Sequence, residues 1–507
     1  MTIDSSNRLF KIEGINQSII IGDADTQTYS RLERALEFLT RQTRNNGNVI
    51  ILSEEIQSPS SENYKRISTL LEKYKLSKII GIGNLKNEAS LFPNHDFTAY
   101  DSAEAFIRDV SDTDFYSRNI LIKVDKSLGF EAIVERLEKK AHETQLVIDL
   151  DKVVYNLHAI RSKLKPTTEL MVMVKAFAYG NGSYDIARLL QDNGVEYLAV
   201  AYADAGFELR NSGITMPIMV LNPEIRAYSA MIRYDLEPQI FSFRTLEAFR
   251  KAIKESGIAP PYPIHIKINT GMNRLGFNVD EINRLGNILS QWPELKVRAV
   301  FTHLAASNDK AMDDMTAKQI AEFETASKGL KNILKKDFKR HVLNSGGIFR
   351  HPHAQYDMVR LGLALYGASP ADEFKQALKP VSRLTTRITQ IRDVKPGETV
   401  GYNPEQTAEH EMKIAVLAIG YADGLPRSLG RGVGKAWLHN HFVPFVGSIC
   451  MDMCMVDITG IECNEGDEVE IFGKNQDIYA FAEQMKTITY EVMTNISHRV
   501  KRVYLSS

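Results

Sequence analysis

Residues 145 to 380 hold eight short apolar runs, and each run is followed by a stretch whose apolar residues recur at helical spacing. Continuous apolar runs of this length are typical of strands that are buried on both faces of a parallel sheet. Eight such strands, each followed by a helix, make a (β/α)8, or TIM-type, barrel. The runs are MVMVKAF, YLAVAYA, PIMVLN, EPQIFS, IHIKIN, VRAVFTH, RHVLNS and MVRLG.

Two segments of different character flank this region. Before it, β-rich runs alternate with amphipathic stretches, for example SIIIG with YSRLERALEFL, which predicts a small α/β domain. After it, strands alternate with turns, which predicts a β-strand domain. A chain of 507 residues has room for about three domains. The predicted domains are residues 1–142, 143–380 and 381–507.

Composition narrows the function classes. The 62 basic and 63 acidic residues give a net charge of -1, which favours neither nucleic acid nor a membrane surface as a partner. No apolar run approaches the length of about 18 residues that spans a bilayer, and the first residues do not resemble a signal peptide, so we expect a cytoplasmic protein. The three cysteines, Cys450, Cys454 and Cys463, predict reduced thiols rather than a disulfide framework.

Motifs for nucleotides and metals are weak. The glycine pair in Gly81-Ile82-Gly83 lacks the third glycine of a dinucleotide fingerprint, and no GxxxxGK[ST] phosphate loop occurs. The pairs His351/His353 and His439/His441 have metal-like spacing, but no third ligand is placed to complete a site. We therefore expect these histidines on solvated loops and strand faces, and no metal centre.

Polar residues gather at the predicted carboxyl ends of the barrel strands, where barrel enzymes place their chemistry. The loop NSGG, residues 344–347, offers a hydroxyl and closely approaching backbone N–H groups, and together with the turn after Arg360 it predicts a cradle for a phosphate dianion. A lysine facing such a cradle across the barrel mouth is what covalently bound pyridoxal phosphate requires. The residues at this rim are Lys175, Lys267, Arg274, His303, Asn344, Ser345, Arg360, Gly362 and Leu363.

Each of these residues also has a structural explanation. Lys175 could place its amine in solvent at a strand end, and the glycine loop could be an ordinary turn. His303 could be a buried, hydrogen-bonded imidazole, and Arg360 could form an ion pair within the barrel. Their joint placement at one rim favours the cofactor site.

From about residue 145 onward, the chain resembles the bacterial PLP-dependent alanine racemases. The resemblance rests on VKAFAYGNG, NTGMNRLGF, FTHLAASND, VLNSGG, MVRLGLALYG, IGYADGLPR and VGSICMDMCMVD, which occur in family order. It implies a barrel followed by a β domain, and a homodimer in which both chains build each active site. It also implies interconversion of L- and D-alanine, which supplies D-alanine for peptidoglycan.

The resemblance assigns the two acid/base groups. Lys175 would hold the cofactor through its amine and act on one face of the substrate, and Tyr421 from the second subunit would act on the other. Inverting a stereocentre needs such a pair, because one group removes the α-proton and the other delivers a proton to the opposite face. His303 and Arg360 match residues that make the phenol a better base, and Arg360 also matches the donor to the pyridine nitrogen.

Further positions carry over in the same way. Arg274 matches the arginine that contacts the substrate carboxylate, and Lys267 matches a lysine that is often carbamylated. The family pattern KVDTGMGRLG reads KINTGMNRLG here, so Asn269 and Asn273 depart from it, and Phe177 stands where asparagine is usual. The other positions that the resemblance implies are Tyr179, Asn344, Ser345, Gly362, Leu363 and Tyr490 for the cofactor, and Met451 and Asp452 for the substrate entrance.

Residues 1–142 resemble the C-terminal domain of the ligase that joins D-alanyl-D-alanine to the UDP-muramoyl-tripeptide, which is fused to the racemase in some bacterial proteins. The ligase's ATP-binding domain has no counterpart here, and Gly22-Asp23-Ala24-Asp25 replaces its Asp-Ser-Tyr-Asn stretch. We therefore expect no ligation, and an appended domain that is structural, mediates association, or remains from a truncated fusion.

Two other functions compete with racemisation. A PLP-dependent decarboxylase of the same architecture would place an acid against the pyridine nitrogen, and Arg360 argues against it. A PLP-binding protein without turnover would lack the β domain and Tyr421. Substrate breadth stays open, because an entrance formed by Met451 and Tyr490 could also admit serine.

Overall fold

The structure is a computed structural model, and it describes residues 9–23, 29–42, 46–53, 61–85, 90, 92–139, 142–369, 372–402 and 406–506. The chain forms two compact units. We call the first the sheet unit, comprising Met1–Asp151, Arg383–Gln476 and His498–Ser507, and the second the barrel unit, comprising Lys152–Ser382 and Asp477–Ser497. Among the described helices, none has the length and apolar character needed to cross a membrane.

The barrel unit contains a parallel sheet of eight strands in the order β14-β13-β12-β11-β10-β9-β8-β15. Each predicted apolar run overlaps one of them, which confirms the predicted TIM-type barrel. The sheet almost closes on itself, because the Asp357 N–H donates to the Arg340 carbonyl at 3.1 Å and the Arg360 N–H to the Leu343 carbonyl at 2.9 Å. The strands are β8 (Glu169–Met173), β9 (Tyr197–Val200), β10 (Ile218–Val220), β11 (Leu236–Ile240), β12 (Tyr262–Lys267), β13 (Leu295–Phe301), β14 (Lys339–His341) and β15 (Met358–Leu361).

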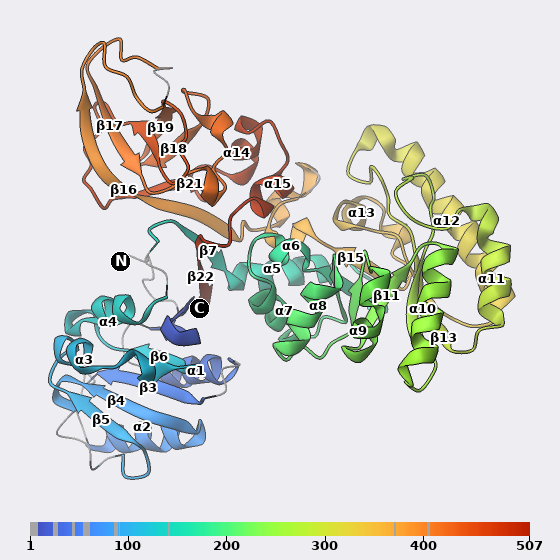
Figure 1. Cartoon of the computed structure of the whole chain (residues 1–507), viewed down its shortest axis with the longest axis horizontal. Coiled ribbons are helices and arrows are strands. Elements are labelled where there is room, and N and C mark those ends of the chain that lie inside the picture. Colours follow the sequence, from blue (N-terminus) through green and yellow to red (C-terminus); the bar gives the residue numbers. More distant parts are fainter. Residues whose placement is uncertain are drawn as a thin grey trace. The chain divides into compact units, whose positions relative to one another are not determined.

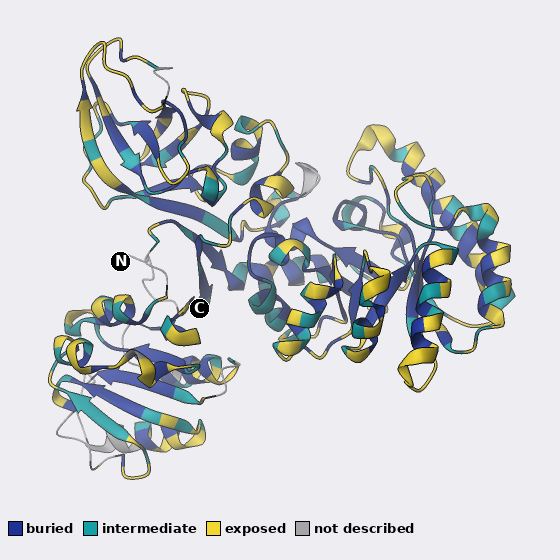
Figure 2. Cartoon of the chain, viewed as in Figure 1, coloured by how far each residue is buried: buried dark blue, intermediate teal, exposed yellow. Residues whose placement is uncertain are grey.

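Helices cover the outside of this sheet (Figure 1). Helix α10 shows why they form where they do: the Ser242 hydroxyl accepts the Thr245 N–H at 3.2 Å as an N-cap, and Gly257 ends the helix with a φ of +69°. The buried apolar side chains of such helices face the strands, and their exposed residues lie on the outer side (Figure 2). Not all helices of the barrel unit cover the sheet. The helical segments of this unit are α5 (Leu150–Arg161), α6 (Lys175–Tyr179), α7 (Ser183–Asp192), α8 (Ala203–Asn211), α9 (Tyr228–Arg233), α10 (Phe243–Ser256), α11 (Ile282–Ser290), α12 (Asp313–Leu334), α13 (Ser345–Arg350), α14 (Ile478–Gln484) and α15 (Thr489–Thr494).

The N-terminal part of the sheet unit is a layer of parallel strands with helices on both faces. One buried apolar cluster includes Leu32 and Leu36 of α1, and a separate cluster includes Phe106 of α3 and Ile133 of α4. The strands, in spatial order, are β2 (Ile19–Gly22), β6 (Asn119–Lys123), β3 (Asn48–Ser53), β4 (Leu76–Ile82) and β5 (Phe97–Tyr100). The helices are α1 (Tyr29–Thr40), α2 (Ser61–Lys73), α3 (Ala103–Asp109) and α4 (Phe130–Leu137).

The C-terminal part of the sheet unit is the expected β domain. The predicted run KAWLHNHFVPFVG forms two strands, because His439 and Asn440 have φ values of +44° and +67° and make the hairpin turn between them. The strands are β16 (Ser382–Val394), β17 (Met412–Leu417), β18 (Lys435–Leu438), β19 (His441–Val446), β20 (Cys454–Asp457) and β21 (Glu468–Phe472).

Three strands join the N-terminal part to the rest of the sheet unit. Strand β22 (Lys501–Ser506) pairs in parallel with β7 (Gln145–Asp149) and antiparallel with β1 (Leu9–Glu13). Val503 and Leu505 of β22 belong to the same buried cluster as Phe10 and Ile12 of β1. The N-terminal strands therefore share a sheet and a hydrophobic core with strands on either side of the barrel sequence.

Candidate active site

Lys175 begins a turn of unusual backbone conformation. The strand predicted to end at this lysine ends earlier, at Met173, and the four residues after Lys175 have φ values between +50° and +55°. Each non-glycine residue in this left-handed region costs about 1–2 kcal/mol. The surroundings hold the turn in place: the Asn181 side-chain amide donates to the Ala178 and Tyr179 carbonyls, each at 3.1 Å. Strain of this kind is retained where function needs it.

Basic side chains from several strands gather around His303. The pKa of His303 lies well below its ordinary value, first because the imidazole is buried and then because Arg360, Lys267, Arg274 and Lys175 repel a further positive charge. The sequence predicted these five residues at one rim, and the structure brings them together. A cluster of lysine and arginine side chains creates a positive potential that attracts an anion.

The two lysines of this group lose their proton more readily than an ordinary lysine. Burial, followed by the charge of Arg274, lowers the pKa of Lys175. Burial, followed by the charges of Arg360 and Arg274, places the pKa of Lys267 well below that of an ordinary lysine. A neutral amine is a nucleophile and a proton acceptor, so both lysines are chemically available.

Arg360 is buried, and both of its Nη atoms donate to groups of the barrel interior. Its Nη1 donates to His341 Nδ1 at 2.8 Å and to the His341 carbonyl at 3.1 Å, and its Nη2 donates to the Thr302 and Val342 carbonyls at 2.7 and 2.9 Å. Burial lowers the pKa of Arg360 to about 9. Since arginine only donates, His341 Nδ1 accepts and the ring proton lies on Nε2.

A second histidine continues this buried network. His265 Nε2 lies 2.6 Å from a Glu237 carboxylate oxygen, and its ring meets that of His341 edge to face at 6.3 Å. Within the described residues, His341 Nε2 and His265 Nδ1 are buried and have no hydrogen-bond partner. No sequence motif marks His341, His265 or Glu237, because histidines and acids inside strands carry no motif of their own.

The residues predicted to form the phosphate cradle lie together in the loops after β14 and β15. The Asn344 side chain caps α13 by accepting the Gly347 N–H at 3.0 Å. The Ser345 hydroxyl accepts the N–H of Gly362 at 3.0 Å, which joins the loops after β14 and β15. A Cβ on Gly362 would lie 2.8 Å from the Tyr179 hydroxyl, so only glycine leaves space here. Leu363 follows, buried, at the start of the next turn.

Aromatic rings stand next to this cradle. The Tyr179 ring lies 5.0 Å from that of Tyr366 and 6.0 Å from that of Tyr490, measured between centroids. Burial, followed by the proximity of Tyr490, raises the pKa of Tyr179, so its phenol stays protonated and can donate. Tyr490 lies on α15 and therefore belongs to the barrel unit, although its sequence position falls within the predicted β domain.

The remaining predicted residues, Tyr421, Met451 and Asp452, belong to the sheet unit. We call residues 420–424 the tyrosine turn and residues 450–453 the gate loop. The Tyr421 N–H donates to the Cys450 carbonyl at 2.9 Å, and the Ala422 N–H to the Met451 carbonyl at 3.0 Å. The Tyr421 and Met451 side chains are 42% and 53% exposed, so they are available to a partner or a substrate.

Histidines and cysteines outside this site do not assemble into a metal centre. In the part of the chain that the structure describes, no group of three or more His, Cys, Asp or Glu side chains is placed to hold an ion. His439 and His441 each bond a backbone carbonyl through Nδ1. Cys450, Cys454 and Cys463 are free thiols.

Comparisons with known proteins converge on one family. The family models "Alanine racemase, N-terminal domain" and "Alanine racemase, C-terminal domain" match residues 148–370 and 381–504. Alanine racemase 1 of Clostridium acetobutylicum is 37% identical over 380 residues, covering 71% of this chain and 95% of that protein. The alanine racemase of Clostridium tetani is 38% identical over 374 residues, covering 71% and 94%.

Solved structures agree with this result. The alanine racemase of Clostridium difficile superposes with a TM-score of 0.69 at 33% identity, covering 73% of this chain and 98% of that one. The alanine racemase of Bartonella henselae, with covalently bound pyridoxal phosphate, gives a TM-score of 0.66 at 29% identity and covers 71% and 99%.

Proposed function

The chain belongs to the alanine racemase family and interconverts L- and D-alanine with pyridoxal phosphate, and we propose how its residues divide this work. When bound, the cofactor withdraws electrons from the α-carbon of alanine and so makes the α-proton acidic. The residues of the barrel unit suit such a group: a partly buried amine with a lowered pKa, a cradle that a Cβ at Gly362 would fill, and basic side chains for an anion. The racemase reaction supplies D-alanine for peptidoglycan.

Lys175 holds the cofactor covalently in this proposal and serves as one acid/base group. Burial and Arg274 lower its pKa, so a larger fraction of this amine is unprotonated and able to take a proton than in an ordinary lysine. The second group is the partner subunit's Tyr421, which is exposed on its own turn and acts on the opposite face of the α-carbon. A homodimer therefore forms the complete site, and Met451 and Asp452 of the gate loop line its entrance.

The remaining residues orient the cofactor and the substrate. Ser345, Gly362, Leu363, Tyr179 and Tyr490, whose ring lies beside that of Tyr179, would hold the phosphate, and Asn344 would also contact the cofactor. His303 and Arg360 would make the Tyr421 phenol a better base. Arg360 would also donate to the pyridine nitrogen, and Arg274 would receive the substrate carboxylate.

We propose that Lys267 becomes a carbamate. Its neutral amine would add carbon dioxide and release one proton, and the resulting anion would pair with the neighbouring Arg274. Such a pair would fix the guanidinium that receives the substrate carboxylate.

For residues 1–142 we propose a structural role and no ligation. Asp23, which stands in the stretch that replaces the ligase motif, accepts hydrogen bonds from Lys123 at 2.8 Å and Arg31 at 3.1 Å, whereas Ala24 and Asp25 lie outside the described residues. The carboxylate is thus engaged by two cations of its own domain. The ranges 1–142, 143–380 and 381–507 remain our proposed domains, and the likeness of the first to the ligase domain remains a proposal.

Decarboxylation is the less favoured activity, because a decarboxylase would have an acid at the pyridine nitrogen and we propose Arg360 for that position. Arg360 donates hydrogen bonds to His341 and to backbone carbonyls. The test is to incubate the purified holoenzyme with L-alanine and measure D-alanine by chiral chromatography, with Lys175→Ala as the control. We expect D-alanine from the parent chain only. Production of an amine and carbon dioxide, or no turnover, would contradict the proposed function.

A further inference from the structure

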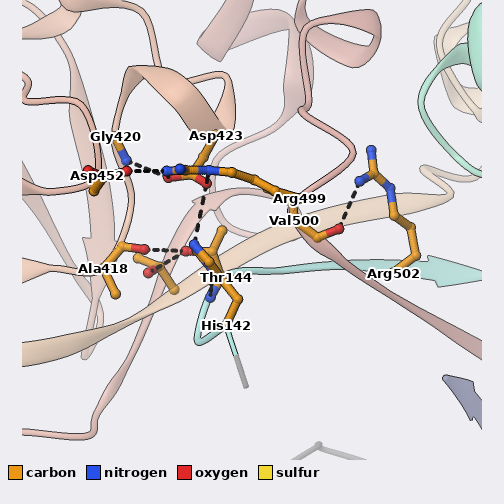
Figure 3. Close-up of polar contacts among 10 residues, drawn as sticks. His142, Thr144, Ala418, Gly420, Asp423, Asp452, Arg499, Val500 and Arg502 are labelled. Carbon is orange, nitrogen blue, oxygen red and sulfur yellow. Dashed lines mark hydrogen bonds and ion pairs between the residues drawn. The ribbon is translucent and has the colours of Figure 1, made fainter. Parts of the chain in front are cut away.

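Arg499 joins the tyrosine turn to the gate loop (Figure 3). Its Nε donates to Asp423 Oδ1 at 2.6 Å, and its Nη2 donates both to Asp423 Oδ2 at 3.0 Å and to Asp452 Oδ1 at 2.8 Å. One planar guanidinium therefore binds a carboxylate from each of the two loops that carry Tyr421 and Met451. A fork of this geometry fixes direction as well as distance.

Asp423 is the centre of this arrangement. Its side chain has no exposed surface, and it also accepts the Gly420 N–H at 2.8 Å, while the Asp423 N–H donates to the Gly420 carbonyl at 3.0 Å. These two bonds close the turn around Tyr421. A buried carboxylate left without its cation is costly, so Arg499 is needed for the turn to keep this shape.

The two loops also touch through their backbones. A Cβ on Gly420 would lie 2.2 Å from the Met451 carbonyl oxygen and 2.5 Å from that of Cys450. The absence of a side chain at Gly420 permits the hydrogen bonds from Tyr421 and Ala422 to the gate loop. The position of the phenol is therefore coupled to the position of the gate.

The segment that joins the N-terminal domain to the rest of the sheet unit also contacts the Asp423 carboxylate. We call its described residues, 138–139 and 142–144, the joint. His142 Nε2 lies 3.4 Å from Asp423 Oδ1, and His142 Nδ1 accepts the Thr144 N–H at 3.0 Å. Because Nδ1 accepts, the proton of the neutral ring lies on Nε2, the nitrogen that faces Asp423. The Thr144 hydroxyl donates to the Ala418 carbonyl at 2.6 Å, which fixes the joint beside the segment that leads into the tyrosine turn.

Two further ion pairs hold the joint against strands β22 and β16 of the sheet unit. Glu138 pairs with Lys501 of β22, and Glu143 lies 3.3 Å from Arg387 of β16. The joint thus contacts the sheet on both sides of His142.

We propose that Arg499 is a positioning residue for racemisation, which holds the tyrosine turn and the gate loop as one body, and that His142 makes the N-terminal domain part of this support. The inference rests on the proposed function, since it assumes that Tyr421 is the base that acts on L-alanine. Neither residue touches the substrate in this account. Their effect is transmitted through Asp423 to the direction of the Tyr421 phenol.

The test measures exchange of the α-proton in D2O, by proton NMR, separately for L- and D-alanine with each holoenzyme. Tyr421→Phe is the reference, and it should slow exchange of L-alanine far more than exchange of D-alanine, because Lys175 still acts on the D-isomer. Arg499→Met should reproduce this asymmetry, with L-alanine exchange lower by about 100-fold, since small misplacements of an acting group cost rates of this order.

Arg499→Lys is the conservative variant. A lysine can pair with one carboxylate but does not offer the planar fork, so we expect an intermediate asymmetry. This variant also serves if Arg499→Met does not fold to a holoenzyme with an unchanged cofactor spectrum.

His142→Ala tests the contribution of the joint. We expect the same asymmetry, with L-alanine exchange lower by up to about five-fold. This is the factor that corresponds to the loss of one polar contact. Lys139→Ala is the matched control, because Lys139 lies in the same joint and pairs with Glu13 on the surface at 3.1 Å, away from Asp423. It should leave both exchange rates unchanged.

These outcomes distinguish the positioning role of Arg499 from the proposed role of Tyr421 in racemisation. Equal losses for both isomers in Arg499→Met and Arg499→Lys, with Tyr421→Phe asymmetric, would overturn the positioning role and leave the proposed function intact. Symmetric losses in Tyr421→Phe itself would overturn both. A parent-like His142→Ala would remove the N-terminal domain from the proposal.

Discussion

His341 Nδ1 accepts a hydrogen bond of 2.8 Å from Arg360 Nη1, and both side chains are buried within the barrel. The bond fixes the ring proton of His341 on Nε2, because arginine has no lone pair to offer. The histidine therefore has to remain neutral for this arrangement to persist, and its pKa is held well below the ordinary value, first by burial and then by Arg360.

This relationship predicts a loss of stability in acid. The pKa of His341 is lowered in the folded chain, so below pH about 6.5 the unfolded chain binds a proton that the folded chain does not, and the free energy of unfolding falls as the pH falls. Each such histidine contributes up to about 1.4 kcal/mol per pH unit. Urea unfolding at several pH values should show a shallower dependence for His341→Leu than for the parent chain.

The control for that measurement is His410→Leu, at an exposed histidine of the sheet unit. His341→Leu should also lower stability by about 1–3 kcal/mol at neutral pH, because it leaves a buried Arg360 donor without its acceptor. An unchanged pH dependence in His341→Leu would show that this ring is not held neutral.

Lys175 should react as an unusually acidic lysine in the cofactor-free chain. Burial and Arg274 lower its pKa, so its amine is deprotonated at pH values where ordinary lysines, with a pKa near 10.4, are still protonated. Competitive acetylation followed by mass spectrometry should label Lys175 faster than its exposure alone implies. Lys73, whose pKa is raised by its hydrogen bond to Glu33, is the internal comparison, and equal pH profiles for the two would refute the prediction.

Gly420→Ala should separate the tyrosine turn from the gate loop. The added methyl group would lie 2.2 Å from the Met451 carbonyl, a distance that no packing adjustment of side chains relieves, because the obstacle is backbone. We expect a large loss of racemase activity in a chain that still binds the cofactor. Gly329→Ala, within α12, is the control: its Cβ would make an ordinary contact of 3.7 Å with the Ile282 side chain of α11, so activity should persist. An active Gly420→Ala enzyme would show that the close approach is dispensable.

Phe10→Ala should destabilise the sheet unit by about 3–5 kcal/mol, the usual cost of removing a buried phenylalanine. Phe10 is 1% exposed and lies in the cluster that also contains Val503 and Leu505. The lost stability should also be felt by β22. We therefore expect Phe10→Ala to lower the temperature of thermal unfolding and to weaken the protection of the β22 amides from hydrogen exchange. Phe442→Ala, at a side chain that is 44% exposed, should have little effect. If Phe10→Ala leaves the protection of β22 unchanged, the two strands do not share a core.

The barrel could be predicted because its strands are apolar on both faces, and the rim residues because they occupy equivalent strand ends. The left-handed turn after Lys175 could not, since Ala176 and Phe177 have no local preference for it and adopt it only because tertiary contacts outweigh the cost. The pairing of His265 with Glu237 could not be predicted for a related reason. The two residues lie on different strands, and they meet only because β11 and β12 pair in parallel.

The pairing of β1 with β22 was also beyond sequence reasoning, because it joins segments from the two ends of the described chain. Periodicity predicts that a strand exists but not its partner. The same limit applies to Tyr490, whose helix packs with the barrel although the surrounding sequence is that of the β domain.

Strand β1 has a further consequence for biosynthesis. Leu9 lies opposite Ser506, so a ribosome adding about 5–20 residues per second needs on the order of 25–100 s between the two strands. Throughout that interval the edge of β1 that pairs with β22 has no native neighbour, although the other edge can pair with β2. An unpaired strand edge is the condition under which nascent chains associate with one another. A chaperone that shields this edge would increase the yield of the folded enzyme more than one that acts on the barrel.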